Sequence, residues 1–156
     1  MFKFLEKRKE TKKHAARLYE SILQQARLPF FYEQHGVPDT VTGRFELVVM
    51  HSFLVWRRVQ DEGVEGQRLA QALFDIMFRD LSYALRNIGV GDLAVPHHMK
   101  RMMRGYKGRV LAYRDAVEAV DKNYEPLMTA LRKNLFATVK DPAEESLKFF
   151  ACYILG

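Results

Sequence analysis

Apolar side chains recur every three or four residues along almost the whole chain, and no run alternates between apolar and polar residues as a half-buried strand would. This spacing predicts an all-α fold, a single-domain bundle of about six helices. The predicted helices cover residues 7–26, 42 to a break at 63–66, 69–88, 95–121, 124–135 and 141–154. The fourth of them carries the cleanest amphipathic stripe.

The second predicted helix differs from the others because residues 47–56 are apolar on nearly every side. A soluble protein tolerates such a helix only where neighbours enclose it, so we expect it to be central. Its start is predicted near Thr42, whose hydroxyl would cap the helix with Glu46 as the reciprocal partner. We expect His51 to be a core histidine with a hydrogen-bond partner. Cys152, in the last apolar run, is also expected to be buried.

The net charge of +6 is concentrated in two segments. Residues 1–17 hold seven Lys or Arg against two Glu, and residues 93–114 hold six Lys or Arg with no acid. We predict a basic N-terminal extension over residues 1–10 and a helical domain over residues 11–156. The extension, with Phe2, Phe4 and Leu5, fits either a membrane-surface helix or a solvated helix start. Both basic segments indicate an anionic partner.

Membrane-spanning and secreted proteins do not fit the sequence. The uncharged run at residues 47–56 is about half of the roughly 20 residues that a membrane span requires. The basic N-terminal segment lacks the apolar block of a secretory signal. One cysteine cannot form an internal disulfide, which favours a reducing compartment. We therefore expect a cytoplasmic location.

Motifs for catalysis or for binding a metal or cofactor are absent. The chain has no His-Glu-x-x-His, no Gly-x-Ser-x-Gly, no phosphate loop and no cysteine pair. The adjacent His97 and His98 would point in different directions from a helix, which suits chelation poorly. We predict no enzymatic activity, no cofactor and no metal site.

The candidate binding residues lie in two glycine-containing connectors, the first at residues 28–46 and the second at residues 89–96, and in the fourth predicted helix. For the connector residues, contact with a partner and capping of helices are both open interpretations. In the helix, methionines alternate with bases, so the stripe either enters the core or forms an adaptable surface flanked by cations. The predicted partner-binding residues are Asp39, Thr40, Arg44, Asp92, Met99, Lys100, Arg101, Met103, Arg104, Lys107 and Arg109.

Five ordered motifs carry a resemblance to a known family. They are Phe31-Tyr32 through Gly43-Arg44-Phe45, Arg57-Arg58, Ala72-Leu73-Phe74-Asp75, Gly89-Val90-Gly91-Asp92-Leu93 and Gly108-Arg109. On these motifs the chain resembles the ubiquinol-cytochrome c chaperone family over roughly residues 19–113. It departs from the family pattern at Ser82, where a second acid is usual, and at residues 104–107.

The resemblance implies an all-helical assembly factor that catalyses nothing. Such a protein would bind cytochrome b, nascent or newly inserted, and assist assembly of the ubiquinol-cytochrome c reductase complex. It also implies, as further partners, the ribosome near the tunnel exit, an anionic membrane surface and a small partner protein. For a bacterial member it implies a location in the cytoplasm, at the inner face of the inner membrane.

Two other classes of function are alternatives. The first is a basic ribosome- or RNA-binding protein without a dedicated client, whose binding would weaken steeply with salt. The second is a lipid-processing or quinone-related enzyme, which would require a deep pocket containing acids with shifted pKa values.

Overall fold

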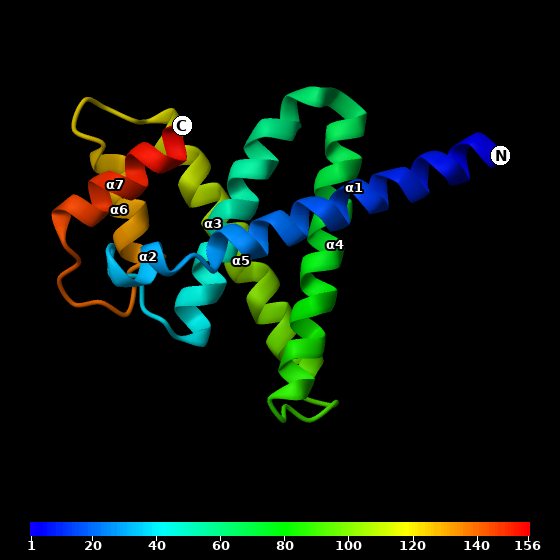
Figure 1. Ribbon diagram of the computed structural model, residues 1–156, viewed down its shortest axis with the longest axis horizontal. Coiled ribbons are helices and arrows are strands. Elements are labelled where there is room, and N and C mark those ends of the chain that lie inside the picture. Colours follow the sequence, from blue (N-terminus) through cyan, green and yellow to red (C-terminus); the bar gives the residue numbers. More distant parts are fainter. The chain divides into compact units, whose positions relative to one another are not determined.

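The computed structural model describes residues 1–156 as helices joined by short connectors, without strands (Figure 1). The elements are α1 (Phe2–Ala26), α2 (Pro29–Glu33), α3 (Val41–Val59), the short 3₁₀ turn η1 (Gln60–Glu62), α4 (Gly63–Asn87), α5 (Val95–Glu118), α6 (Glu125–Lys133) and α7 (Glu144–Leu155). The all-α prediction is confirmed. The six predicted helices correspond to α1 and α3 to α7, and the short α2, begun by Pro29, is additional.

Two predicted boundaries shift. The first helix begins at Phe2 rather than near residue 7, so the basic segment forms the first turns of α1. The predicted break at residues 63–66 falls instead at η1, because Gly63 adopts a φ of +62° and starts α4 directly. The separation of residues 1–10 from the helical domain stays a prediction. No helix is both long and apolar enough to span a membrane.

Contacts divide the chain into two units, each made of two segments. Unit 1 comprises residues 1–22 and 55–107, and unit 2 comprises residues 23–54 and 108–156. The helices α1, α3 and α5 each contribute to both units.

The core of unit 2 forms around α3. Leu47, Val49, Met50 and Phe53 are all fully buried, as the apolar run predicted. The other large buried side chains of this unit are Phe31, Tyr113, Leu127, Leu131, Leu135, Phe136, Leu147 and Phe150.

The prediction that His51 is a core histidine is confirmed. Its Nδ1 lies 2.7 Å from the carbonyl oxygen of Leu47, and its Nε2 lies 2.8 Å from the hydroxyl of Tyr153. Because a carbonyl only accepts, Nδ1 carries the proton and Nε2 accepts from Tyr153. Gln25 in turn donates to the Tyr153 hydroxyl at 3.1 Å. Burial lowers the pKa of His51, which keeps this imidazole neutral.

Unit 1 contains an aromatic cluster beside the buried aliphatic side chains Leu73, Met77 and Val95. The rings of Phe74, Phe78 and Tyr106 pack with centroids 4.5–5.6 Å apart, and burial raises the pKa of Tyr106 to about 12. The hydroxyl of Tyr19 on α1 donates to Asp80 on α4 at 2.5 Å. This hydrogen bond joins α1 to α4.

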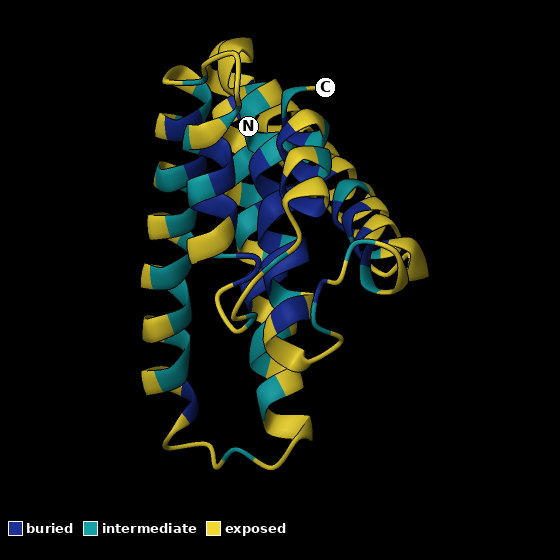
Figure 2. Cartoon of the chain, turned by 90° about the vertical axis from the view of Figure 1, so that its left-hand side faces the viewer, coloured by how far each residue is buried: buried dark blue, intermediate teal, exposed yellow.

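The prediction that Cys152 is buried is wrong. In Figure 2 buried residues gather where the helices face one another, and exposed residues lie on their outer sides. In α7 the buried stripe consists of Leu147, Phe150, Ala151 and Ile154, at helical spacing. Position 152 falls on the opposite side, so the thiol is exposed.

Candidate partner-binding site

The first connector ends in a capped helix start. The Thr40 hydroxyl accepts a hydrogen bond from the backbone N–H of Gly43 at 3.1 Å, so Thr40, and not the predicted Thr42, caps α3. Gly43 also allows a close approach, since a Cβ atom there would lie 1.8 Å from the carbonyl oxygen of Pro38. This contact accounts for a proline and a glycine five residues apart in the first motif.

An ion pair follows directly on this cap. The Nε of Arg44 donates to Asp39 Oδ1 at 2.7 Å, and this bond holds the pKa of Asp39 below its usual range. Both side chains are more than half exposed. Together with Arg27, Tyr32 and Glu33 they line an open hollow of about 300 Å³. Asp39 and Arg44 therefore present polar groups to solvent without being required by the core.

Arg109 is held by Glu46. The prediction that Glu46 completes a cap is wrong: its side chain is 2% exposed, and both carboxylate oxygens accept from Arg109 Nε at 2.7 Å. The Nη2 of Arg109 also donates to Glu46, and the guanidinium carbon lies 5.9 Å from the centre of the Phe45 ring. These bonds raise the pKa of Arg109. Direct partner binding by Arg109 stays a prediction.

The second connector is almost entirely exposed (Figure 2). Gly89 turns the chain after α4 with a φ of +93°, and Arg86 donates to Asp92 at 3.2 Å. Two large apolar side chains face solvent here, since Ile88 is 69% exposed and Leu93 is 100% exposed. Large apolar side chains that are exposed at a connector are candidates for contact with an apolar partner.

The first half of α5 carries a row of exposed cations. Lys100, Arg101, Arg104 and Lys107 are exposed and lie on one face, at the spacing i, i+1, i+4, i+7. The ion pairs of α5 involve only Arg109 and Arg114, so none of these four cations has a carboxylate partner; Arg101 lies 3.3 Å from His98 Nδ1. Met99 and Met103 are half-buried at the edge of this row. We refer to these six residues as the α5 surface.

The predicted residues therefore fall into two groups. Asp39, Thr40, Arg44 and Arg109 belong to unit 2, whereas Asp92 and all six residues of the α5 surface belong to unit 1. Within unit 1, Asp92 lies in the connector that leads into α5. Ile88 and Leu93 are not among the predicted binding residues. Ile88 was expected in the buried stripe of the third predicted helix, but it lies exposed at the C-cap of α4. The signal of Leu93 was a large apolar side chain beside glycines, between two predicted helices.

The shifted carboxylates belong to ion pairs. The pKa values of Asp39, Glu65 and Glu144 all move downward, each because a cation donates a hydrogen bond to it. A carboxyl acting as a general acid near neutral pH would require a shift in the opposite direction. No group of three or more His, Cys, Asp or Glu side chains is arranged to hold a metal ion.

Comparisons with known proteins converge on one family. The family model described as "Ubiquinol-cytochrome C chaperone" matches residues 33–154. The mouse "Ubiquinol-cytochrome c reductase complex assembly factor 1" is 23% identical over 134 residues, which cover 85% of this chain and 44% of that protein. The Xenopus laevis protein of that name is 22% identical over 121 residues, covering 78% and 59%. The chain thus spans about half the length of the curated relatives it matches.

A solved structure agrees with these matches. The crystal structure of the Cbp3 homolog from Brucella abortus is similar with a TM-score of 0.81 and 34% sequence identity, covering 99% of this chain and 84% of that chain. The matched family model covers most of the chain, including the α3 cap, the Glu46–Arg109 pair, the second connector and the α5 surface. The chain therefore belongs to the ubiquinol-cytochrome c chaperone family, whose members include assembly factors of the ubiquinol-cytochrome c reductase complex.

Proposed function

We propose that this protein binds newly made cytochrome b and assists assembly of the ubiquinol-cytochrome c reductase complex, acting by binding and without turnover. Its membership of the family and the names of its relatives support the role in assembly. The observation that carries the binding role is the second connector with the α5 surface, where exposed apolar side chains are followed by four cations without a carboxylate partner.

The chemistry of this region suits a hydrophobic client. Leu93 and Ile88 offer apolar contact area, and the half-buried Met99 and Met103 can adapt their flexible thioethers to varied apolar surfaces. The cations beside them would pair with acidic groups that flank an apolar segment. A newly made membrane protein presents long apolar segments with polar flanks, which is the kind of partner that this arrangement fits.

The most direct test places a photo-crosslinking amino acid at position 93. Because Leu93 is completely exposed, the replacement should leave the fold intact. A control at Ala137, an exposed residue between α6 and α7, carries the same crosslinker in unit 2. We expect crosslinks from position 93 to newly made cytochrome b and few from position 137. Equal crosslinking from both positions, or none from position 93, would contradict this client site.

The role in assembly is tested in cells. Removing the gene should lower the haem absorbance of the assembled complex, and the wild-type gene should restore it. A variant with Leu93→Asp and Ile88→Asp should fold normally yet fail to restore the complex, because charges now occupy the apolar contact. Normal complex levels after deletion of the gene would remove the proposed function.

The first connector would serve a second contact, for which a small partner protein is our candidate. Solvent screens this exposed ion pair, so Asp39→Ala should hardly change stability. Loss of complex assembly in Asp39→Ala or Asp92→Ala with unchanged melting temperature would support partner contact. A lower melting temperature with normal assembly would assign these residues to the fold alone.

Ribosome binding is the alternative that the cation row favours. Binding to ribosomal RNA would weaken steeply with salt, because each neutralised phosphate releases counterions. Binding of an apolar client would persist at higher salt. Measuring ribosome binding and client binding across a salt series separates these two modes of binding.

We propose that the protein works at the inner face of the bacterial membrane that receives cytochrome b.

A further inference from the structure

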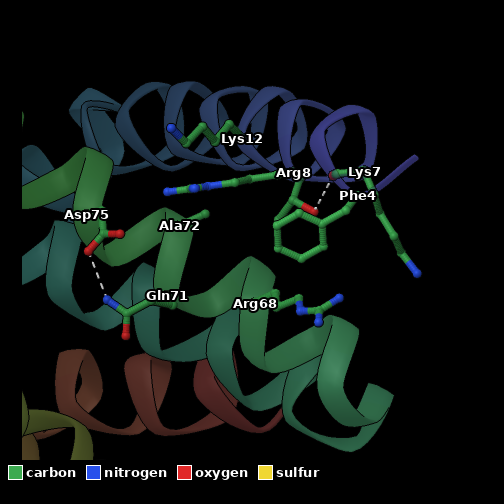
Figure 3. A pocket seen from close by; sticks show the side chains of 9 residues that line it. Phe4, Lys7, Arg8, Lys12, Arg68, Gln71, Ala72 and Asp75 are labelled. Carbon is green, nitrogen blue, oxygen red and sulfur yellow. Dashed lines mark hydrogen bonds between the residues drawn. The ribbon is translucent and has the colours of Figure 1, made fainter. Parts of the chain in front are cut away.

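A second cationic region lies in unit 1, between α1 and α4. Here the two helices enclose an open groove of about 280 Å³ (Figure 3). Four of its lining residues are cations, Lys7, Arg8 and Lys12 from α1 and Arg68 from α4, whereas Phe4 and Ala72 provide apolar surface. We call it the α1–α4 groove. Neither the client site nor the first connector includes any of these residues.

The charges in this groove are not balanced. Glu65 at its edge is shared by Lys7 at 2.8 Å and Arg68 at 3.2 Å. The one acid among the lining residues, Asp75, already accepts a hydrogen bond from Gln71 at 2.8 Å (Figure 3). Arg8 and Lys12 form no ion pair. An anion entering the groove would therefore meet cations without displacing a carboxylate from Arg8 or Lys12.

The position of these cations on α1 is informative. The residues of α1 that line the groove lie on the face that, further along the helix, carries the buried Ala15 and Ile22. Cations that serve only solubility belong on the outer face, where Lys9, Lys13 and Arg17 lie. The first half of α1 therefore turns a cationic surface, rather than an apolar one, toward its neighbour α4.

Apolar side chains at the end of the groove narrow the class of ligand. Phe4 lines the groove one turn before Arg8 and is 60% exposed, and the adjacent Phe2 and Leu5 are 83% and 47% exposed. Exposed aromatic and aliphatic side chains next to Lys and Arg are typical of helices that lie in a membrane interface. A nucleic-acid strand would require a series of stacking rings, and Phe4 is the only ring in this groove.

We propose that the α1–α4 groove binds the phosphate headgroup of an anionic phospholipid and seats unit 1 on a membrane surface. Arg8, Lys12 and Arg68 neutralise the phosphate, while Phe2, Phe4 and Leu5 enter the boundary between headgroups and acyl chains. This inference deepens the proposed location at a membrane, on which it rests, because it names the groove and the class of lipid. It does not depend on cytochrome b being the client.

The test compares two triple variants of the full chain by vesicle flotation. The groove variant is Arg8→Gln, Lys12→Gln and Arg68→Gln, and it leaves the Lys7–Glu65 pair intact. The control variant, Lys9→Gln, Lys13→Gln and Arg17→Gln, removes the same charge from the outer face of α1. The vesicles contain phosphatidylcholine alone or mixed with phosphatidylglycerol, and circular dichroism checks that both variants fold.

We expect the wild type to bind the mixed vesicles and not those of phosphatidylcholine alone. The groove variant should lose binding on the order of a hundredfold, since each cation at a membrane surface contributes about fivefold. The control variant should lose less than about tenfold. Phe4→Ser, which changes no charge, should weaken vesicle binding by about tenfold and leave any weak binding of inorganic phosphate unchanged.

Three results would overturn the proposal. Equal losses in the two triple variants would mean that diffuse charge, and not the groove, attracts the membrane. Binding of inorganic phosphate or of RNA in the groove without vesicle binding would assign the cations to another anion. Equal binding to both kinds of vesicle would remove the role of the headgroup charge. None of these results affects crosslinking from position 93, so the client proposal is judged separately.

Discussion

The ion pair between Glu46 and Arg109 allows the sharpest quantitative prediction about the fold. Replacing Arg109 with Met keeps most of the apolar stem but removes the cation, so the carboxylate of Glu46, 2% exposed, is left without its partner. Breaking a buried pair from one side in this way costs about 3–5 kcal/mol. For a chain of this size a loss of 3 kcal/mol lowers the melting temperature by about 6–12 °C.

The opposite substitution should be milder. Glu46→Leu leaves Arg109 unpaired, but the Arg109 side chain is 26% exposed and can turn its guanidinium toward water. We expect a loss of about 1–3 kcal/mol. The double variant, Glu46→Leu with Arg109→Met, strands no charge and should be more stable than Arg109→Met alone.

Urea unfolding followed by circular dichroism at constant pH measures all three variants. The control is Arg114→Met on the same helix, where solvent screens the exposed pair with Asp115 and its loss should hardly change stability. Two results would refute a buried, coupled pair. Arg109→Met could lower the free energy of unfolding no more than Arg114→Met, or the losses of the two single variants could simply add in the double variant.

Three further predictions concern single positions in unit 2. Gly43→Ala should destabilise the protein by at least about 2 kcal/mol in thermal unfolding, because the new methyl group would overlap the Pro38 carbonyl; an unchanged melting temperature would refute the close approach. Stability should fall as the pH drops below 6.5, because burial lowers the pKa of His51 and the unfolded chain then binds the extra proton; His51→Gln should flatten melting temperature against pH. Tyr113→Phe should be neutral or stabilising by up to about 1 kcal/mol in urea, since the buried hydroxyl has no partner, and a clear loss would reveal one.

The elements that the sequence predicts well are those decided by local pattern. Residues 47–56 are apolar on all sides, and a helix of that kind has to be enclosed, which is why both the buried α3 and the core position of His51 could be predicted. Cys152 shows the converse, since a continuous apolar run hides which side of the helix is buried. The buried side of α7 is set by the helices against which it packs.

Boundaries that depend on distant contacts were less predictable. Thr40 and Thr42 are equally good caps by residue type, and Thr40 is selected because Gly43 has to pass close to Pro38. Glu46 resembles a capping residue until Arg109, 63 positions later, is placed beside it. Spacing within one helix carries no information about such a pairing.

The candidate binding site shows the same division. The charges and methionines of α5 are visible in the sequence, and they led to all six residues of the α5 surface. The α1–α4 groove was not predicted, because its cations come from residues 7–12 and 68, which only the packing of α1 on α4 brings together. The positive charge of residues 1–17 is visible in the sequence, but the packing of Lys7, Arg8 and Lys12 against α4 is not.

The interleaving of the two units along the chain has a consequence for how the protein is made. Unit 1 has all of its residues once position 107 has left the ribosome, whereas unit 2 waits for α7. Residues 41–54 of α3 belong to unit 2, and they are synthesised long before residues 108–156 complete that unit. During translation this protein is therefore itself a chain with an uncovered hydrophobic helix. No truncation of either end can yield one complete unit without part of the other.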